Sequence, residues 1–206
     1  MKYAALGFRV HSGWTALVGL SLENGLPRVL LRERPHLVKT FTYEFRQPYH
    51  TAGKRRPTEA RNVIAHAQAE ARDLAYRAIQ SVQTNLQKQD YQLAFCGLLL
   101  ASGRPLPALP QILASHPLIH TADGELFREA LLHASRRCRI ETFTMKESEL
   151  LEKATLTFRL QPDALGRQLS DLGRAFGSPW SQDEKLASLV AWLAISSRSP
   201  LSAKAR

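Results

Sequence analysis

The sequence predicts a single α/β domain built around one mixed β-sheet, and three stretches of the chain carry this prediction. Asn24-Gly25 lies between two apolar runs and is a strong hairpin signal, because both central residues of a type I′ turn need positive φ. Residues 91–100 form a nearly continuous apolar run, which is typical of a central strand buried on both faces. Residues 58–89 repeat apolar side chains at intervals of three and four, which predicts a long amphipathic helix. Together these features indicate a sheet with helices on both faces.

The first part of the chain predicts a three-stranded antiparallel meander. Residues 3–8 and 14–20 are short apolar runs rich in strand formers, and the turn residues His11-Ser12-Gly13 separate them. After Asn24-Gly25 the strand pattern resumes at residues 29–31. Two tight turns therefore join three consecutive strands.

A long excursion follows at residues 36–57. It mixes aromatic and basic side chains and is interrupted by Pro48, Gly53 and Pro57, which favour turns. We expect one short strand within it, at residues 39–45. Because loops of this length often carry function, the excursion is a candidate binding region.

The remainder of the chain predicts alternating helices and strands. Thr58 can cap the long helix. Beyond the strand at 91–100, the expected elements are a short helix at 111–115, an irregular turn at 116–120, a helix from Thr121 or Asp123 through Arg137, a strand at 140–144, a helix opened by the capping box Thr144-Met145-Lys146-Glu147, and a last helix opened by the capping box Ser181-Gln182-Asp183-Glu184. Residues from Ser196 onward are polar and small, so we expect them to fray.

Three strands followed by helix, strand, helix, strand and helix is the order of elements in the ribonuclease-H-like fold. The chain shows no internal repeat and no break in composition that would mark a second domain. We therefore expect a single ribonuclease-H-like domain at residues 1–195 and a flexible C-terminal tail at residues 196–206.

Charge and composition narrow the class of partner. The 206 residues carry a formal net charge of +10, which favours polyanionic partners such as nucleic acid. The two cysteines lack a second cysteine or histidine at zinc-ligand spacing, so we expect them to be core thiols of a reducing compartment. No leader-like segment opens the sequence, and the longest uncharged apolar stretch is too short to span a bilayer. The sequence thus predicts a cytoplasmic protein without a membrane span or a cofactor.

One family shares several of these patterns. The segment Leu6-Gly7-Phe8-Arg9-Val10-His11-Ser12-Gly13-Trp14-Thr15-Ala16-Leu17-Val18 resembles the first hairpin of RuvC-type Holliday-junction resolvases. Residues 123–147 are similar to a later helix, a strand and the following helix start of that family, and residues 183–193 are similar to its acidic last helix. The resemblance spans most of the chain and implies the same fold.

The resemblance also implies a site that has lost most of its acids. Nucleases of this kind need several carboxylates to hold two divalent cations. Position by position, the family's first-strand aspartate falls on Arg9, and no acid occurs at the end of the central strand, in residues 98–103. On the last helix Asp183 matches the first acid, whereas Leu186 replaces the second. We therefore expect no nuclease activity, and we expect Arg9 to pair with Asp183 and to supply the positive charge that cations supply in the active enzymes.

A second candidate site lies at residues 116–125, the densest cluster of chemically capable side chains. In this fold it would lie near the carboxyl end of the central strand, where ligands bind in open α/β sheets. Its side chains are His116, His120, Thr121, Asp123 and Glu125. Two interpretations stay open: an enzymatic site that uses His120, Asp123 and Glu125, or ordinary helix capping with histidines bonded to backbone carbonyls. The spacing of the two histidines matches no established ligand pattern, so no metal site is predicted here.

Two basic clusters are candidates for binding nucleic acid. Their residues are Lys54, Arg55, Arg56 and Arg61 in the first, and Arg136, Arg137 and Arg139 in the second. Phe41, Tyr43 and Phe45 add aromatic rings between basic residues; they suit either stacking on nucleobases or an ordinary half-buried strand.

Three functional hypotheses follow. The first is a non-catalytic ribonuclease-H-like domain that binds nucleic acid or a protein partner. The second is an enzyme of unassigned reaction that uses the His120, Asp123 and Glu125 region. The third is a divergent metal-dependent nuclease that retains Asp183. The sequence does not indicate an oligomeric state.

Overall fold

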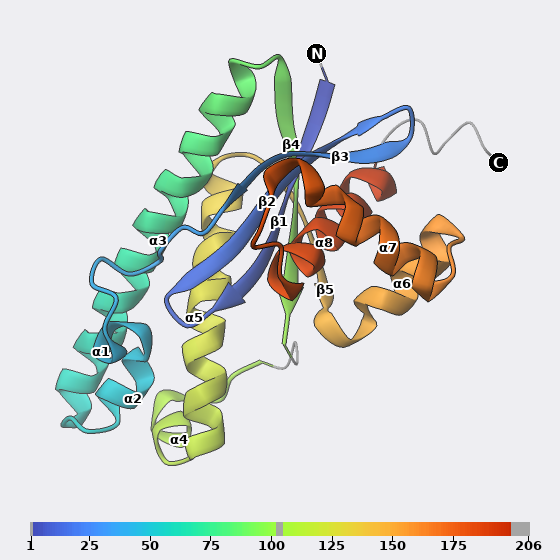
Figure 1. Ribbon diagram of the computed structural model, residues 1–206. Helices are drawn as coiled ribbons and strands as arrows, with labels where there is room; N and C mark the ends of the chain where they lie inside the picture. The colour runs from blue at the N-terminus through green and yellow to red at the C-terminus, as the bar shows by residue number, and fades with distance from the viewer. Residues whose placement is uncertain (1, 102–104, 199–206) are drawn as a thin grey trace.

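Five strands form one mixed sheet at the centre of the computed structural model, which describes residues 2–101 and 105–198. The strand order is β3-β2-β1-β4-β5 (Figure 1). The strands are β1 (Lys2–His11), β2 (Trp14–Glu23), β3 (Leu26–Glu33), β4 (Tyr91–Leu100) and β5 (Glu141–Lys146). β1 pairs antiparallel with β2 and β2 with β3, whereas β4 is parallel to β1 and β5 is parallel to β4. This is the predicted meander joined to a parallel portion.

The hairpin between β2 and β3 turns where the sequence predicts. Asn24 and Gly25 have φ values of 51° and 81°, the positive values that a type I′ turn requires. Tyr91 is paired with Lys2 in the parallel register. The hairpin and the central strand therefore belong to one sheet, as the ribonuclease-H-like prediction requires.

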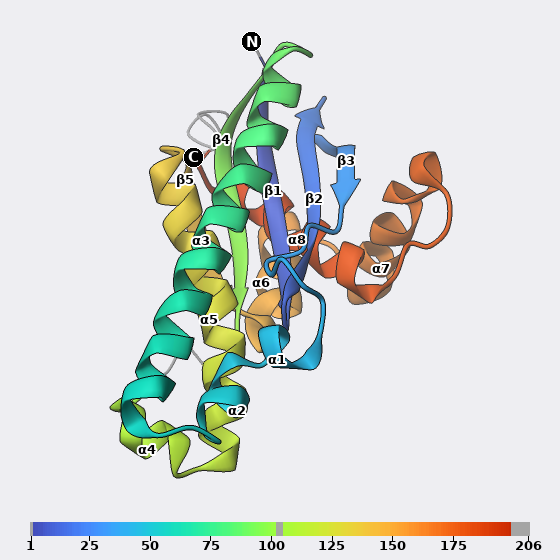
Figure 2. The same ribbon diagram turned by 90° about the vertical axis from the view of Figure 1, so that its left-hand side faces the viewer.

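Helices cover both faces of the sheet (Figures 1 and 2). They are α1 (Tyr43–Arg46), α2 (Pro48–Ala52), α3 (Pro57–Gln87), α4 (Leu109–Leu113), α5 (His116–Arg137), α6 (Leu150–Phe158), α7 (Pro162–Leu172) and α8 (Gln182–Arg198). α3 and α5 pack against each other on one face, and α8, flanked by α6 and α7, covers the other. The N-terminal ends of α3 and α5 extend past the carboxyl ends of β1 and β4, and α1, α2 and α4 gather around them (Figure 1).

Two glycines allow α8 to lie directly on the sheet. A Cβ at Gly7 in β1 would overlap the carbonyl oxygen of Ala187, and a Cβ at Gly97 in β4 would lie 2.5 Å from the carbonyl oxygen of Val190. Any larger residue would push the helix away, because these obstacles are backbone atoms of α8. The close approach fixes the first turn of α8, which carries Asp183 and Glu184, over the carboxyl end of β1.

The structure corrects four local predictions. Thr58 does not cap the long helix, because α3 begins at Pro57 with Arg56 as its N-cap. The strand expected at residues 39–45 is absent; this stretch is an irregular segment that leads into α1. α5 begins at His116 and not at Thr121 or Asp123, because Pro117 fits the first turn of a helix, where its missing N–H costs nothing. Thr144 does not cap a helix, since β5 continues to Lys146 and a 3-10 turn at Glu147–Glu149 precedes α6.

The last helix, α8, extends further than expected. α8 continues to Arg198, three residues into the segment predicted to be a flexible tail, and residues 199–206 lie outside the described part of the chain. Cys96 is buried, and burial raises the pKa of its thiol to about 12. Within residues 2–101 and 105–198, no helix is long and apolar enough to cross a membrane.

Candidate functional site at the carboxyl end of the sheet

The site centres on Arg9, which lies near the carboxyl end of β1. Its guanidinium donates a hydrogen bond to Asp183 in the first turn of α8, and Nη2 donates to Glu147 Oε1 at 3.1 Å. Arg9 and Asp183 are thus in direct contact, as expected from the sequence. One guanidinium therefore bridges two carboxylates that come from elements far apart in the chain.

His11 joins the same cluster because it lies two residues after Arg9 in β1 and side chains at this spacing share a face of a strand. Its Nε2 is 3.0 Å from Arg9 Nη1 and 3.1 Å from Asp183 Oδ1. A guanidinium can only donate and an ionised carboxylate can only accept, so Nε2 bonds to Arg9 when it carries no proton and to Asp183 when it is protonated. The imidazole also stacks on Trp14, with ring centroids 4.3 Å apart.

A capping box holds the first turn of α8 in place. The backbone N–H of Ser181 donates to Glu184 Oε2 at 2.9 Å, and the N–H of Asp183 donates to Ser181 Oγ at 3.2 Å. The bond from Ser181 to Glu184 is the one that the predicted capping box requires, and the Ser181 hydroxyl caps the N–H of Asp183. Arg34 Nε and Nη2 donate to Glu184 Oε1 at 2.8 and 2.6 Å. Arg34, just past the end of β3, therefore ties this edge of the sheet to α8.

Glu184 gives stability at this helix start a dependence on pH. Its side chain is 1% exposed. Burial alone raises the pKa of its carboxyl, but the hydrogen bonds from Ser181 and Arg34 outweigh burial and lower the pKa below the usual 4.5. A lowered pKa in the folded state contributes stability that is present above the unfolded pKa and is lost as pH falls through the folded pKa.

We therefore expect the unfolding free energy of the wild type to decrease as pH falls below about 4.5. In the Glu184→Gln variant, the unfolding free energy should decrease less over the same pH range. Glu184→Ala should cost about 1–3 kcal/mol at pH 7, because it leaves Arg34 and the Ser181 N–H without their acceptor. Urea denaturation at several pH values measures both effects. Glu152→Gln, an exposed position on α6, is the matched control and should follow the wild type. Equal slopes for wild type and Glu184→Gln would contradict the expectation.

Comparison with known proteins places the fold. No family model and no curated protein matches the sequence. Two solved structures of RuvC from Thermus thermophilus do match, one of them in complex with a Holliday junction substrate. The complex aligns with a TM-score of 0.52 and 10% identity over 92% of this chain and 90% of that chain. The other aligns with a TM-score of 0.50 and 10% identity over 92% and 91%.

The chain has the fold of RuvC. The element order predicted from the sequence is therefore confirmed by structures that share only 10% of their residues with it. At this identity the likeness concerns the fold, so the chemistry has to be argued from the residues at the site.

The residues at the site do not fit the divalent cations that the RuvC-like pattern implies. The Arg9 guanidinium already occupies the space between Asp183 and Glu147, and a cation placed there would meet a like charge. β4 offers no acid at residues 98–101, whereas residues 102–104 lie outside the described chain. Leu186 follows Asp183 by three residues, at the place where the resemblance to that family implies a second acid. The site therefore carries its own positive charge.

Glu147 and His11 are site residues that the sequence reasoning missed. Glu147 adds a second carboxylate beside Asp183, whereas the sequence predicted one. Each had a detectable signal, since Glu147 directly follows a strand parallel to β4 and His11 shares a strand face with Arg9. Carboxyl ends of neighbouring parallel strands meet at one edge of a sheet, which is the rule that would have found Glu147.

The structure brings only part of the second predicted site together, because Asp123 and Glu125 have different contacts. Asp123 is buried and accepts hydrogen bonds from the Tyr49 backbone N–H at 2.7 Å and from His50 Nδ1 at 2.6 Å. Burial raises the pKa of Asp123, and these hydrogen bonds oppose the rise. Glu125 instead pairs with Arg128 at 3.1 Å, and Arg128 donates to the Leu99 carbonyl near the end of β4. Asp123 and Glu125 thus have separate partners, and His50, which the sequence did not single out, is the contact of Asp123.

The two basic clusters lie at opposite ends of the helical layer. Lys54 and Arg55 are exposed between α2 and α3, and Arg56 is paired with Glu59 at 2.6 Å. At the other end, the guanidinium of Arg137 stacks 3.7 Å from the ring of Tyr76. Tyr76 lies about 28 Å along α3 from its first residue at a rise of 1.5 Å per residue. The clusters therefore cannot contact the same phosphate group.

For the aromatic residues of the excursion, the half-buried strand interpretation is wrong. Phe41 and Tyr43 are 43% and 56% exposed. Phe41 stacks on His36 with centroids 4.4 Å apart, and the Arg46 guanidinium lies 4.5 Å from the Phe41 ring. Arg46 also donates to the Ser12 carbonyl in the β1–β2 turn at 3.1 Å. Exposed rings and cations are thus anchored beside the hairpin that carries Arg9 and His11.

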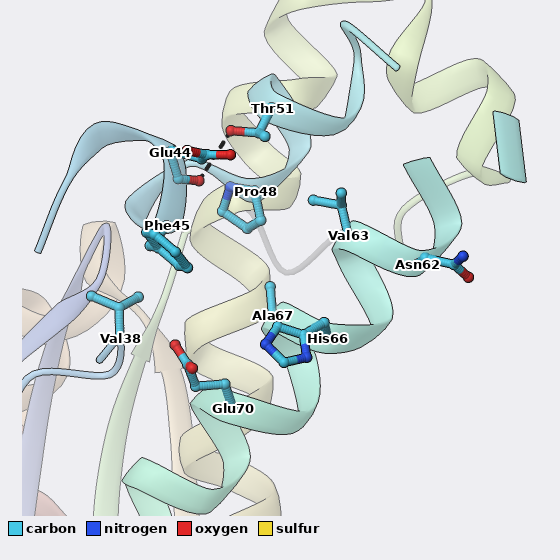
Figure 3. Close-up of a pocket in the computed structure, with 10 residues that line it drawn as sticks. All are labelled: Val38, Glu44, Phe45, Pro48, Thr51, Asn62, Val63, His66, Ala67 and Glu70. Atoms are coloured by element: carbon cyan, nitrogen blue, oxygen red, sulfur yellow. Dashed lines mark hydrogen bonds between the residues drawn. The ribbon is translucent and has the colours of Figure 1, made fainter. Parts of the chain in front are cut away.

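A mostly apolar cavity of about 330 Å³ lies between the α1–α2 segment and α3 (Figure 3). Its polar groups include Glu70, which accepts a hydrogen bond from the Lys39 backbone N–H at 3.1 Å. Thr51 Oγ1 donates to the Glu44 carbonyl at 3.0 Å across the top of the cavity (Figure 3). The first contact joins the start of the excursion to α3, and the second joins α2 to α1.

Proposed function

We propose that this protein is a non-catalytic RuvC-like domain that binds nucleic acid at the carboxyl end of its sheet. The observation that carries the proposal is the Arg9 bridge to Asp183 and Glu147. It places one positive charge between two carboxylates of the described chain, so that each carboxylate has a cationic partner. In a metal-dependent nuclease, cations would lie between these carboxylates and the phosphate backbone of the substrate. In this chain the Arg9 guanidinium takes that position.

The surroundings of the bridge suit a nucleic acid. The net charge of +10 favours a polyanion and predicts salt-sensitive binding. His36, Phe41 and Arg46 form a stacked group beside the hairpin turn, and aromatic and guanidinium planes of this kind stack on unpaired bases. The Lys54–Arg55 pair lies in the segment that continues from this group. The matched RuvC structure contains a Holliday junction substrate, which makes a four-way DNA junction the first probe, with single-stranded DNA as the second.

We expect the affinity for the junction to fall steeply as the salt concentration rises. The double variant Lys54→Ala/Arg55→Ala should reduce the slope of log K against log salt by about 2, because each lost phosphate contact removes about 0.9 from the slope on duplex DNA. Fluorescence anisotropy between 50 and 200 mM salt, a range typical of such measurements, gives the slope. Lys153→Ala/Arg167→Ala removes two exposed cations from α6 and α7 and is the matched control.

Three results would contradict the proposal. The first is an absence of binding to both probes at low salt. The second is an equal change of slope in the two double variants. The third is Mg²⁺- or Mn²⁺-dependent cleavage of the junction that disappears in Asp183→Asn, which would establish the divergent nuclease instead.

A further inference from the structure

Three histidines converge at the contact between α2 and α5, away from the Arg9 bridge. His116 and His120 are four residues apart in α5, so their side chains share one face of the helix. His50 reaches them from α2. One ring nitrogen from each residue lies within 4.8 Å of the other two. The chain separates His50 from His116 by more than sixty residues, which is why the sequence spacing did not reveal the group.

The geometry of the rings distinguishes this group from ordinary packing. The ring planes of His116 and His120 meet at 86°, and those of His50 and His116 at 89°. Stacked rings would turn their nitrogens to the side, whereas edge-to-face rings at centroid distances of 4.4 to 5.4 Å can direct nitrogens to a common point. Three tetrahedral ligands at the usual Zn–N distance stand roughly 3.3 Å apart. His116 and His120 are exposed, so small side-chain rotations can close the remaining gap.

Asp123 supplies the support that a metal-binding histidine requires. His50 Nδ1 is 2.6 Å from Asp123 Oδ2, which leaves Nε2 of His50 as the nitrogen available to an ion. The other oxygen of Asp123 is held by the Tyr49 N–H at 2.7 Å. Carboxylates in this position orient the ligating imidazole and raise its basicity. The carboxylate thus belongs to the surroundings of the site, and the ligands are three imidazoles.

We propose that His50, His116 and His120 bind a divalent transition-metal ion of the zinc type. Imidazole nitrogens suit Zn²⁺, Co²⁺, Ni²⁺ and Cu²⁺, whereas Mg²⁺ and Ca²⁺ prefer oxygen ligands. Three protein ligands leave a fourth tetrahedral position for water or another small ligand. The bound ion joins α2 to the first two turns of α5, and so fixes the excursion that carries the stacked aromatic group. The site shares no residue with the Arg9 bridge, so its metal binding and DNA binding can fail independently.

The test is titration of the full chain, prepared without a histidine tag and freed of metal, with Zn²⁺ followed by isothermal calorimetry. We expect one ion per chain and a higher melting temperature with Zn²⁺, because an ion that binds the native state stabilises it. His120→Ala and His116→Ala should each weaken Zn²⁺ at least tenfold, and Asp123→Asn should weaken it by about ten- to a hundredfold. Bound Co²⁺ should show the strong visible absorption of a tetrahedral site.

His133→Ala is the matched control, since His133 is exposed on α5 nearer its C-terminal end and lies outside the group. It should bind Zn²⁺ as the wild type does. The proposal is overturned if His120→Ala and His133→Ala bind Zn²⁺ equally, or if Mg²⁺ competes with Zn²⁺ at similar concentration. It is also overturned if inorganic phosphate raises the melting temperature in place of Zn²⁺ and does so through the same histidines, which would make the group an anion site.

Discussion

Gly7→Ala is expected to destabilise the protein by about 3 kcal/mol or more, because a single added methyl group would overlap the carbonyl oxygen of Ala187. No side-chain rotation relieves this overlap, so α8 must move away from β1. The movement would also separate Asp183 from Arg9. Thermal and urea denaturation measure the loss of stability.

Gly166→Ala is a control of opposite sign. Gly166 lies in α7 and a Cβ there meets no atom within 4 Å, so alanine should stabilise the helix by about 0.5–1 kcal/mol. Gly97→Ala meets the Val190 carbonyl at 2.5 Å and should also destabilise. If Gly7→Ala were as stable as the wild type, α8 would not rest on the sheet as described.

Arg9→Ala should destabilise by about 2–3 kcal/mol, because it leaves Asp183 and Glu147 close together without a counter-charge. Breaking a fully buried pair costs about 3–5 kcal/mol. The expected value is smaller because the side chains of Arg9 and Asp183 are 25% and 19% exposed and solvent screens their interaction. The melting temperature of the wild type should not change with Mg²⁺ or Mn²⁺.

A double-mutant cycle separates the ion pair from simple loss of packing. Asp183→Asn should lower the free energy of unfolding less in the Arg9→Ala variant than in the wild type. In the Arg9→Ala variant the Asp183 carboxylate is already unpaired, so its removal loses no ion pair. Arg28→Ala breaks an exposed pair with Glu23 at 2.7 Å and should have little effect. Additive effects of Arg9→Ala and Asp183→Asn, or a rise in wild-type melting temperature with Mn²⁺, would contradict the role given to Arg9.

The fold was largely predictable from the sequence because its strongest signals are local. Asn24-Gly25 fixes a turn by the φ values it tolerates, and the apolar run at residues 91–100 fixes a doubly buried strand. Predictions failed where a local pattern admits two structures. Alternating aromatics at residues 41–45 match a strand, but no neighbouring strand lies beside them, and a short helix followed by Pro48 takes their place.

The sites were less predictable because their residues meet only through the fold. The Arg9 and Asp183 contact was accessible through the resemblance to a known family. Glu147 and His50 were not singled out, since each meets its partners across more than sixty residues of chain. His50 has no second ligand nearby in the sequence, so no ligand spacing could reveal it, although the fold brings it next to His116 and His120.

Because α8 packs closely on Gly7 and Gly97, the Arg9 site has one rigid side, which carries Asp183, and one more mobile side, which carries Glu147. On one side, α8 is in close backbone contact with Gly7 of β1 and Gly97 of β4. Asp183, in the first turn of α8, can therefore shift only if the helix moves on the sheet. On the other side, Glu147 lies in a 3-10 turn after β5, which is an edge strand of the sheet. If a ligand changes the shape of this site, the residues that move are therefore Glu147 and the side chain of Arg9. The main chain around Asp183 keeps its position.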